Sequence, residues 1–196
     1  MQRNVGPGAL LRLIGGALRL DGATFRAAVA PSAPTRLHLA IVALAAVSSG
    51  YAYAMEAVAS GMVGERDFAL YRLLVLVGIA ETVIQFTLFV GVVYVIRLIA
   101  RRPAVGFGAL CRLFALGVAP VCLMVLGPTF GVQDWLRGGL IAWRIVISVV
   151  GLKIATESSW ISAVLTVVAA DFVSSPIVSV LLFGVRNRPG AGALPV

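Results

Sequence analysis

Three ionisable side chains stand inside apolar stretches of this sequence, where a charge is costly. Glu81 lies in VGIAETVIQF, Arg144 in GGLIAWRIVISVVGLKIA and Asp171 in VVAADFVSSP. An arginine at the centre of a bilayer costs about 2.5–3.5 kcal/mol on insertion scales, so each such charge needs a partner or a function. Two acids and one base suit an intramembrane ion pair, a proton relay or a path for a polar solute.

The positions of these residues predict that the three charges meet at a similar depth. At a rise of 1.5 Å per residue, each lies within about one helical turn of the middle of its apolar stretch. We expect Arg144 to pair with Glu81, Asp171 or both, because a planar guanidinium can satisfy two carboxylates and because intramembrane charges face the bundle interior. Gln85, one turn after Glu81, could join this network.

The charge network has two interpretations. In the first, it is an ionic clasp that fixes the order of the helices. In the second, an acid exchanges protons or contacts a solute. An arginine partner stabilises the ionised acid and opposes proton exchange, which favours the clasp, whereas two acids that share one arginine would leave transport open.

These residues belong to apolar stretches that are each long enough to cross about 30 Å of hydrocarbon. The composition agrees, because 60% of the 196 residues are hydrophobic and only 12% are charged, against about 25% charged in soluble domains. The sequence predicts an all-α integral membrane bundle of five transmembrane helices with an N-terminal amphipathic interfacial helix. The expected spans are about 37–60, 69–98, 107–126, 136–155 and 160–183.

Three regions follow from these spans: a cytoplasmic amphipathic segment at 1–35, a transmembrane domain at 36–184 and a short polar tail at 185–196. In residues 9–20 the leucines share one helical face and Arg12 and Arg19 share the other. Asp21 is a plausible N-cap for a second short helix that carries Arg26.

The amphipathic segment has two possible locations. It can lie among the headgroups of an anionic leaflet, with Arg12, Arg19 and Arg26 on phosphates. Alternatively, it can pack on the cytoplasmic face of its own bundle.

Prolines and small residues predict features of individual spans. Pro120 and Pro176 each remove an intrahelical hydrogen bond, so we expect a kink at each, either lining a site or without functional role. Ala46, Gly50 and Ala54 recur every four residues, which predicts close helix packing within the chain or against a partner.

Several function classes lack their required residues. The net charge is +8, but the basic residues are dispersed between apolar segments, so nucleic acid is not expected as a partner. The sequence has no HExxH, CxxC or glycine-rich phosphate loop, and its single histidine, His38, lies about 15 Å along the same helix from Ser48 and Ser49. We therefore expect no enzyme activity, no cofactor and no metal site.

The basic residues also predict orientation. With the N-terminus inside, ten Lys and Arg fall on the inner side and five on the outer side, and an odd number of spans then puts the C-terminus outside. The excess of arginine over lysine, together with many Ala and Gly residues, is typical of a bacterial gene rich in GC. The expected location is the bacterial cytoplasmic (inner) membrane, as a multi-pass protein.

Several segments resemble the Yip family (Ypt/Rab-GTPase-interacting proteins), particularly its short bacterial members. The similarity covers about residues 10–183 and is carried by LDGATFRAAVAP, IRLIARRPAVGFGALCRL and ALGVAP, with Gly117 to Pro120 as the most specific part. The resemblance implies a helical bundle with its N-terminus inside and C-terminus outside, without enzymatic activity, that acts through partner proteins. The longer cytoplasmic region by which eukaryotic relatives engage small GTPases has no counterpart here.

The sequence supports two hypotheses for the function. The first is a non-enzymatic protein of membrane organisation, or an accessory or scaffold subunit, whose partners are the lipid bilayer and possible other membrane proteins or further copies of itself. The second is a small proton- or solute-conducting transporter that uses Glu81, Asp171 and Arg144.

Overall fold

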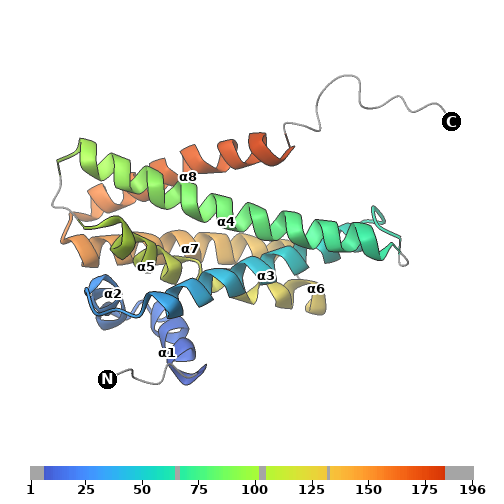
Figure 1. The fold of residues 1–196 in the computed structure, drawn as a ribbon, viewed down its shortest axis with the longest axis horizontal. Coiled ribbons are helices and arrows are strands. Elements are labelled where there is room, and N and C mark those ends of the chain that lie inside the picture. The colour runs from blue at the N-terminus through green and yellow to red at the C-terminus, as the bar shows by residue number, and fades with distance from the viewer. Residues whose placement is uncertain (1–6, 65–66, 102–104, 132, 184–196) are drawn as a thin grey trace.

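The computed structural model describes residues 7–64, 67–101, 105–131 and 133–183, and these residues form a helical bundle without strands (Figure 1). The helices in chain order are α1 (Pro7–Leu18), α2 (Gly22–Val29), α3 (Thr35–Ala59), α4 (Phe68–Ile99), α5 (Phe107–Gly117), the 3₁₀ helix η1 (Ala119–Val125), α6 (Leu126–Phe130), α7 (Gln133–Thr156) and α8 (Trp160–Phe183).

Five segments are long and apolar enough to span a membrane, as predicted. Four are the single helices α3, α4, α7 and α8, and the third span is built from α5, η1 and part of α6. The third span is the most enclosed, since 61% of its most apolar 18-residue stretch is buried inside the bundle, against 17% for that of α4. The outward faces of α4 and α8 expose Leu, Ile, Val and Phe side chains, an apolar surface that acyl chains would cover.

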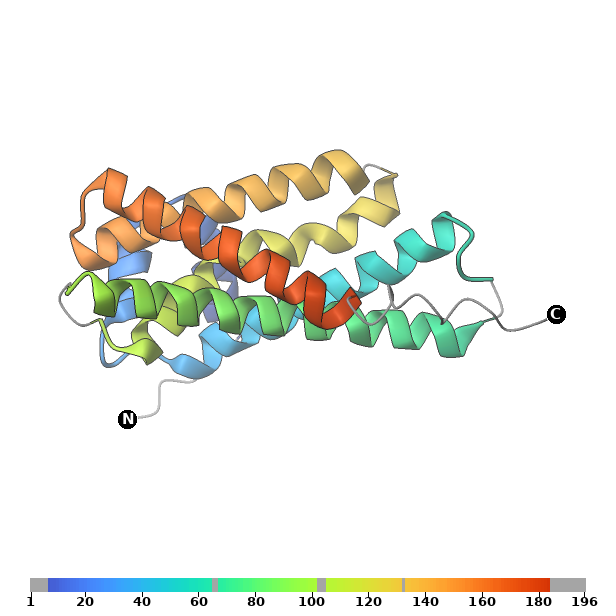
Figure 2. The ribbon, with the colours of Figure 1, turned by 90° about the horizontal axis from the view of Figure 1, so that it is seen from above.

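The five spans form a ring around the axis of the bundle, in an order that differs from their order along the chain. α3 packs against α4, α4 against α8, α8 against α7, and α7 against η1, which returns to α3. Figure 2 shows the same arrangement from a second direction, with α8 lying across α4. α5 contacts α3, α4 and α7, and it therefore fills the middle of the ring in one half of the bundle.

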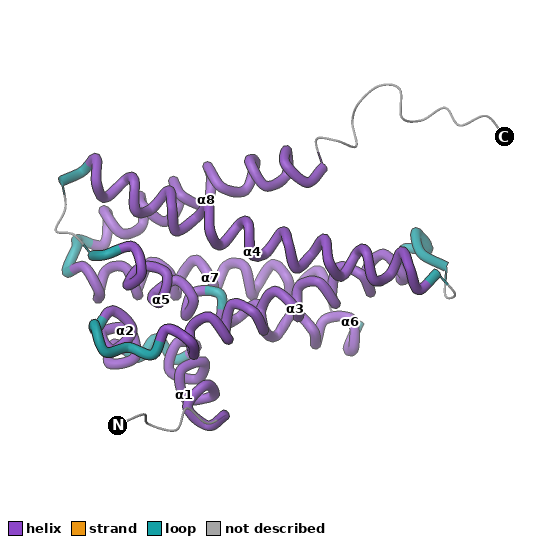
Figure 3. The backbone as a smooth tube through the Cα atoms, in the orientation of Figure 1, coloured by secondary structure: helices purple, strands orange, loops and turns teal. Residues whose placement is uncertain are grey.

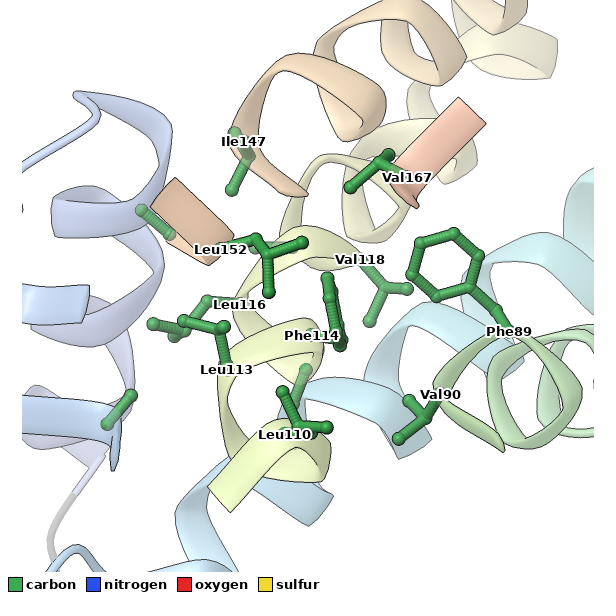
Figure 4. Close-up of a cluster of buried hydrophobic side chains, with 14 of the residues drawn as sticks. Phe89, Val90, Leu110, Leu113, Phe114, Leu116, Val118, Ile147, Leu152 and Val167 are labelled. Atoms are coloured by element: carbon green, nitrogen blue, oxygen red, sulfur yellow. The ribbon is translucent and has the colours of Figure 1, made fainter. Parts of the chain in front are cut away.

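The hydrophobic core lies around α5 (Figure 4). Phe114 is 1% exposed and meets Phe89 of α4 edge to face, with ring centroids 5.0 Å apart. Ile147 and Leu152 of α7 and Val167 of α8 complete the packing from the other side. The bundle is thus tightly filled in the half that contains α5.

The third span changes helix type next to Pro120. α5 ends at Gly117, and the N–H of Val121 donates to the carbonyl of Val118 in the tighter 3₁₀ pattern. Pro120 has no N–H to donate to the carbonyl four residues earlier, which favours a break at this position (Figure 3). Ser48 of α3 donates to the carbonyl of Cys122 at 3.0 Å, so a neighbouring helix satisfies part of the altered backbone.

α8, by contrast, continues through Pro176 without a break. The helix type therefore changes only at the first of the two predicted kinks.

α3 and α4 approach each other through glycines. A Cβ atom on Gly50 would lie 2.4 Å from the carbonyl oxygen of Val75, and one on Gly78 would lie 2.7 Å from the Cα atom of Gly50. Ala46 and Ala54, on either side of Gly50, are also buried. The small-residue stripe of the first span thus packs within the chain.

The N-terminal helices α1 and α2 pack on one end of the bundle, at the lower left of Figure 1. Ala17 and Phe25 are fully buried there. Arg112 of α5 donates from Nε to the carbonyl of Ala28 at 2.9 Å and from Nη2 to that of Ala30 at 3.2 Å. A cation at the last carbonyls of α2 also complements the helix dipole.

Asp21 caps α2, as the sequence predicted. Its carboxylate accepts hydrogen bonds from the Thr24 hydroxyl and from the N–H groups of Ala23 and Thr24. The Thr24 hydrogen bond is the largest cause of a lowered Asp21 pKa, with the Ala23 N–H second. Because the folded pKa lies below the unfolded one, the cap stabilises α2 at neutral pH and is lost as the pH falls through the folded value.

The two ends of the bundle differ in charge. Within the described residues, the end that carries α1 and α2 holds most of the basic side chains, and the opposite end holds Arg72 and Arg137. The basic residues at the first end are Arg12, Arg19, Arg26, Arg36, Arg97, Arg101, Arg112 and Lys153.

Replacing Gly50 by alanine tests the contact between α3 and α4. The added Cβ would meet backbone atoms rather than a flexible side chain, so we expect a loss of about 1–3 kcal/mol, as for other overpacked sites, measured by thermal unfolding in detergent. Gly91→Ala is the matched control, because a Cβ there meets nothing within 4 Å and alanine favours a helix. Equal stability of the two variants would contradict the close approach.

Candidate functional site: a charged cavity inside the bundle

An ion pair joins α7 and α8 near the middle of both helices. Nη2 of Arg144 donates to Oδ1 of Asp171. The two side chains are 16% and 25% exposed, so the pair is largely enclosed. The guanidinium, which cannot lose its proton in a protein, thus has a carboxylate partner inside the apolar region.

This ion pair borders a cavity of about 230 Å³ that receives side chains from all five spans. In the third span, the cavity is lined by the end of α5, by η1 and by α6, and η1 and α6 contact α3 and α7. Its polar lining consists of Ser49, Tyr53, Glu56, Glu81, Thr82, Gln85, Arg137, Arg144, Ser148, Asp171 and Ser175.

The two ends of the cavity differ in chemistry. Near the end where α3 stops and α7 starts, Arg137 and Glu56 form an ion pair of 3.2 Å, with side chains 54% and 47% exposed. At the inner end, the cavity meets the hydrophobic core through Phe89, Phe114 and Val167, which Figure 4 labels. The cavity therefore has a charged, exposed mouth and an apolar, buried floor.

Glu81 lines this cavity but does not pair with Arg144. In the part of the chain that the structure describes, its half-buried carboxylate makes no ion pair or hydrogen bond. Of the two acids expected around Arg144, the structure brings only Asp171 into contact.

Gln85 joins the cavity wall in a different way from the one expected. Its Nε2 donates to the hydroxyl of Ser175 at 3.3 Å and so links α4 to α8. Gln85 thus stands beside the charges without bridging them.

The lining carries more acid than base. Glu56, Glu81 and Asp171 face the cavity together with Arg137 and Arg144, and each arginine already contacts one acid. With all five groups ionised, the cavity holds one negative charge in excess, at Glu81. This arrangement can attract a cation or a proton.

Other residues singled out in the sequence lie elsewhere. Arg12, Arg19 and Arg26 are exposed on α1, α2 and the turn between them, and none of the three lines the cavity. Pro120 is buried in the third span beside the cavity-lining Val118. No group of three or more His, Cys, Asp and Glu side chains that could hold a metal ion occurs among the residues described.

Sequence reasoning missed the pair at the mouth. Glu56 lies near the end of the first predicted span and Arg137 near the start of the fourth, so the predicted spans put both at the same membrane face. Opposite charges at equal depth on two spans are a signal for such a pair. The signal is weak at helix ends, where charges are ordinarily solvated.

Comparisons with known proteins identify no matching protein family, no matching curated protein and no matching solved structure.

The ion pair predicts unequal effects of removing its two partners. Asp171→Leu should destabilise more than Arg144→Leu, because a carboxyl group left alone can take up a proton and a guanidinium cannot. The loss should stay below the about 3–5 kcal/mol of a fully buried pair, since both groups border the cavity. Thermal unfolding in detergent measures the loss of stability of each variant.

The double variant Arg144→Leu/Asp171→Leu tests whether the two side chains are in direct contact. It leaves no isolated charge, so it should be more stable than Asp171→Leu alone. A double variant that loses as much as the two single losses combined would contradict a direct contact.

Proposed function

We propose that this protein is a small, non-enzymatic transporter that binds a proton or a small polar solute in the intramembrane cavity. The observation that carries the proposal is Glu81, an acid inside the membrane-spanning region whose carboxylate borders the cavity without a contacting counter-ion. Acids in such positions are costly, and they commonly mark ion and proton pathways.

The shape of the cavity supports access from one side at a time. Its mouth is charged and exposed, and its floor is closed by packed aromatic and aliphatic side chains. Passage across the membrane then requires the floor to open while the mouth closes. The helix break next to Pro120 lies beside that floor and supplies a position where the third span can bend.

The same proposal includes location and orientation. The concentration of basic side chains at the end with α1 and α2 favours that end as the cytoplasmic one. The cavity mouth would then face outward, and the protein would reside in the bacterial cytoplasmic membrane with its N-terminus inside and its C-terminus outside.

Flux into liposomes tests the proposal. Reconstituted protein should raise the movement of protons, followed with an entrapped pH dye, or of at least one labelled small polar solute above that of protein-free liposomes. Glu81→Gln should reduce this flux at least tenfold, because it removes the unpaired charge. Glu157→Gln, which alters an exposed acid in the turn before α8, is the matched control and should keep it.

Two results would refute transport. One is flux no higher than that of protein-free liposomes for every probe. The other is an equal flux through wild-type protein and the Glu81→Gln variant.

The second candidate is the membrane-organising or accessory role that the resemblance to the Yip family implies. It is supported by the exposed arginines Arg12, Arg19 and Arg26, which lie together on the basic end and suit lipid phosphates. Much of the apolar face of α1 packs on the bundle, with Ala17 fully buried. This packing argues against a deep insertion of α1 into the lipid.

Replacement of these three arginines by glutamine tests the second candidate. Native mass spectrometry from mild detergent should then show several-fold less co-purifying anionic lipid or membrane partner than wild type. The cavity variant Glu81→Gln serves as the control and should retain them. Unchanged association after the triple replacement would contradict a role for this end in lipid or partner binding.

A further inference from the structure

The cavity combines one uncompensated carboxylate with a partly aromatic wall. Tyr53 of α3, Phe86 and Phe89 of α4, and Phe114 of α5 all line it. Aromatic rings attract cations through their negative faces, most strongly where water is excluded. The wall and Glu81 therefore favour the same sign of charge.

Of the three acids in the described cavity lining, Glu81 is the one that contacts no arginine. Glu56 and Asp171 already contact Arg137 and Arg144, so a cation that used either acid would have to displace an arginine. Breaking the enclosed pair of Asp171 and Arg144 would be expensive. Glu56 lies at the exposed mouth, where water weakens its attraction for a cation. An entering cation would instead meet Glu81, whose carboxylate breaks no existing contact when it binds.

The size and chemistry of the lining favour one kind of cation. A volume of about 230 Å³ equals several water molecules, at about 30 Å³ for each, which is far more than a proton needs. The described residues provide no cluster of three acidic, histidine or cysteine side chains that could hold a metal ion. A quaternary ammonium ion needs no hydrogen-bond acceptors, and its methyl-covered surface suits aromatic and aliphatic walls.

We infer that the cavity binds a small quaternary ammonium ion, with its charge beside Glu81 and its methyl groups against the aromatic wall. This inference rests on the proposed function, because it names the solute class of the same cavity. Tyr53 and Phe86 are the half-buried aromatic residues of this wall, whereas Phe89 and Phe114 belong to the packed floor.

The test uses choline and its neutral isostere 3,3-dimethylbutan-1-ol, which differ mainly in charge. Titration calorimetry on the purified full chain in detergent should show choline binding at least tenfold tighter than the isostere. Glu81→Gln should abolish this preference, whereas Glu157→Gln should keep it. Equal binding of the two probes to wild-type protein, or a preference that persists in Glu81→Gln, would overturn the inference.

Two further variants separate recognition from folding. Glu81→Asp keeps the charge and should retain most of the preference, so a preference lost in this variant at an unchanged melting temperature would count against charge recognition. Phe86→Leu should weaken choline binding about threefold, from the modest energy of one cation–π contact, and leave the isostere unchanged. Equal weakening of both probes would overturn the aromatic contribution.

The liposome experiment distinguishes this inference from the proposed function. Flux of protons or another solute that depends on Glu81, without choline binding, would overturn the inference and leave transport standing. Choline binding without any flux would support the inference and overturn transport. The absence of both would overturn both.

Discussion

The contact between Arg144 and Asp171 constrains the whole bundle, because a guanidinium cannot discard its charge and must keep a partner within the apolar region. Breaking such a pair costs more than forming it gains, so its main effect is to fix which faces of α7 and α8 meet. Glu81, the third acid of the cavity lining, contacts neither arginine.

The cavity lies beside the change of helix type in the third span. α5 fills the centre of one half, and the change to a 3₁₀ helix next to Pro120 ends that filling. η1 and α6 continue the third span along one wall of the cavity, through Val121, Met124, Gly127 and Pro128. The polar interior thus lies beside the part of the third span that is not a continuous α-helix.

The sequence predicted the five spans well, because unbroken apolar stretches and their lengths are local properties. It also identified the charges, since polar residues stand out in such stretches. The choice of Asp171 over Glu81 was not predictable, because it depends on the rotation of α4 and α8 about their axes. Likewise, Pro120 changes the helix type beside Gly117, whereas α8 runs through Pro176, and only the neighbouring helices decide between these outcomes.

The contact of Gly50 with Gly78 has a mechanical consequence. Because the backbones of α3 and α4 touch there, no side chain between them can change rotamer to let one helix slide past the other. The two helices should move as one stiff unit. Any widening of the interior then has to come from the third span, α7 or α8, which form the rest of the cavity wall.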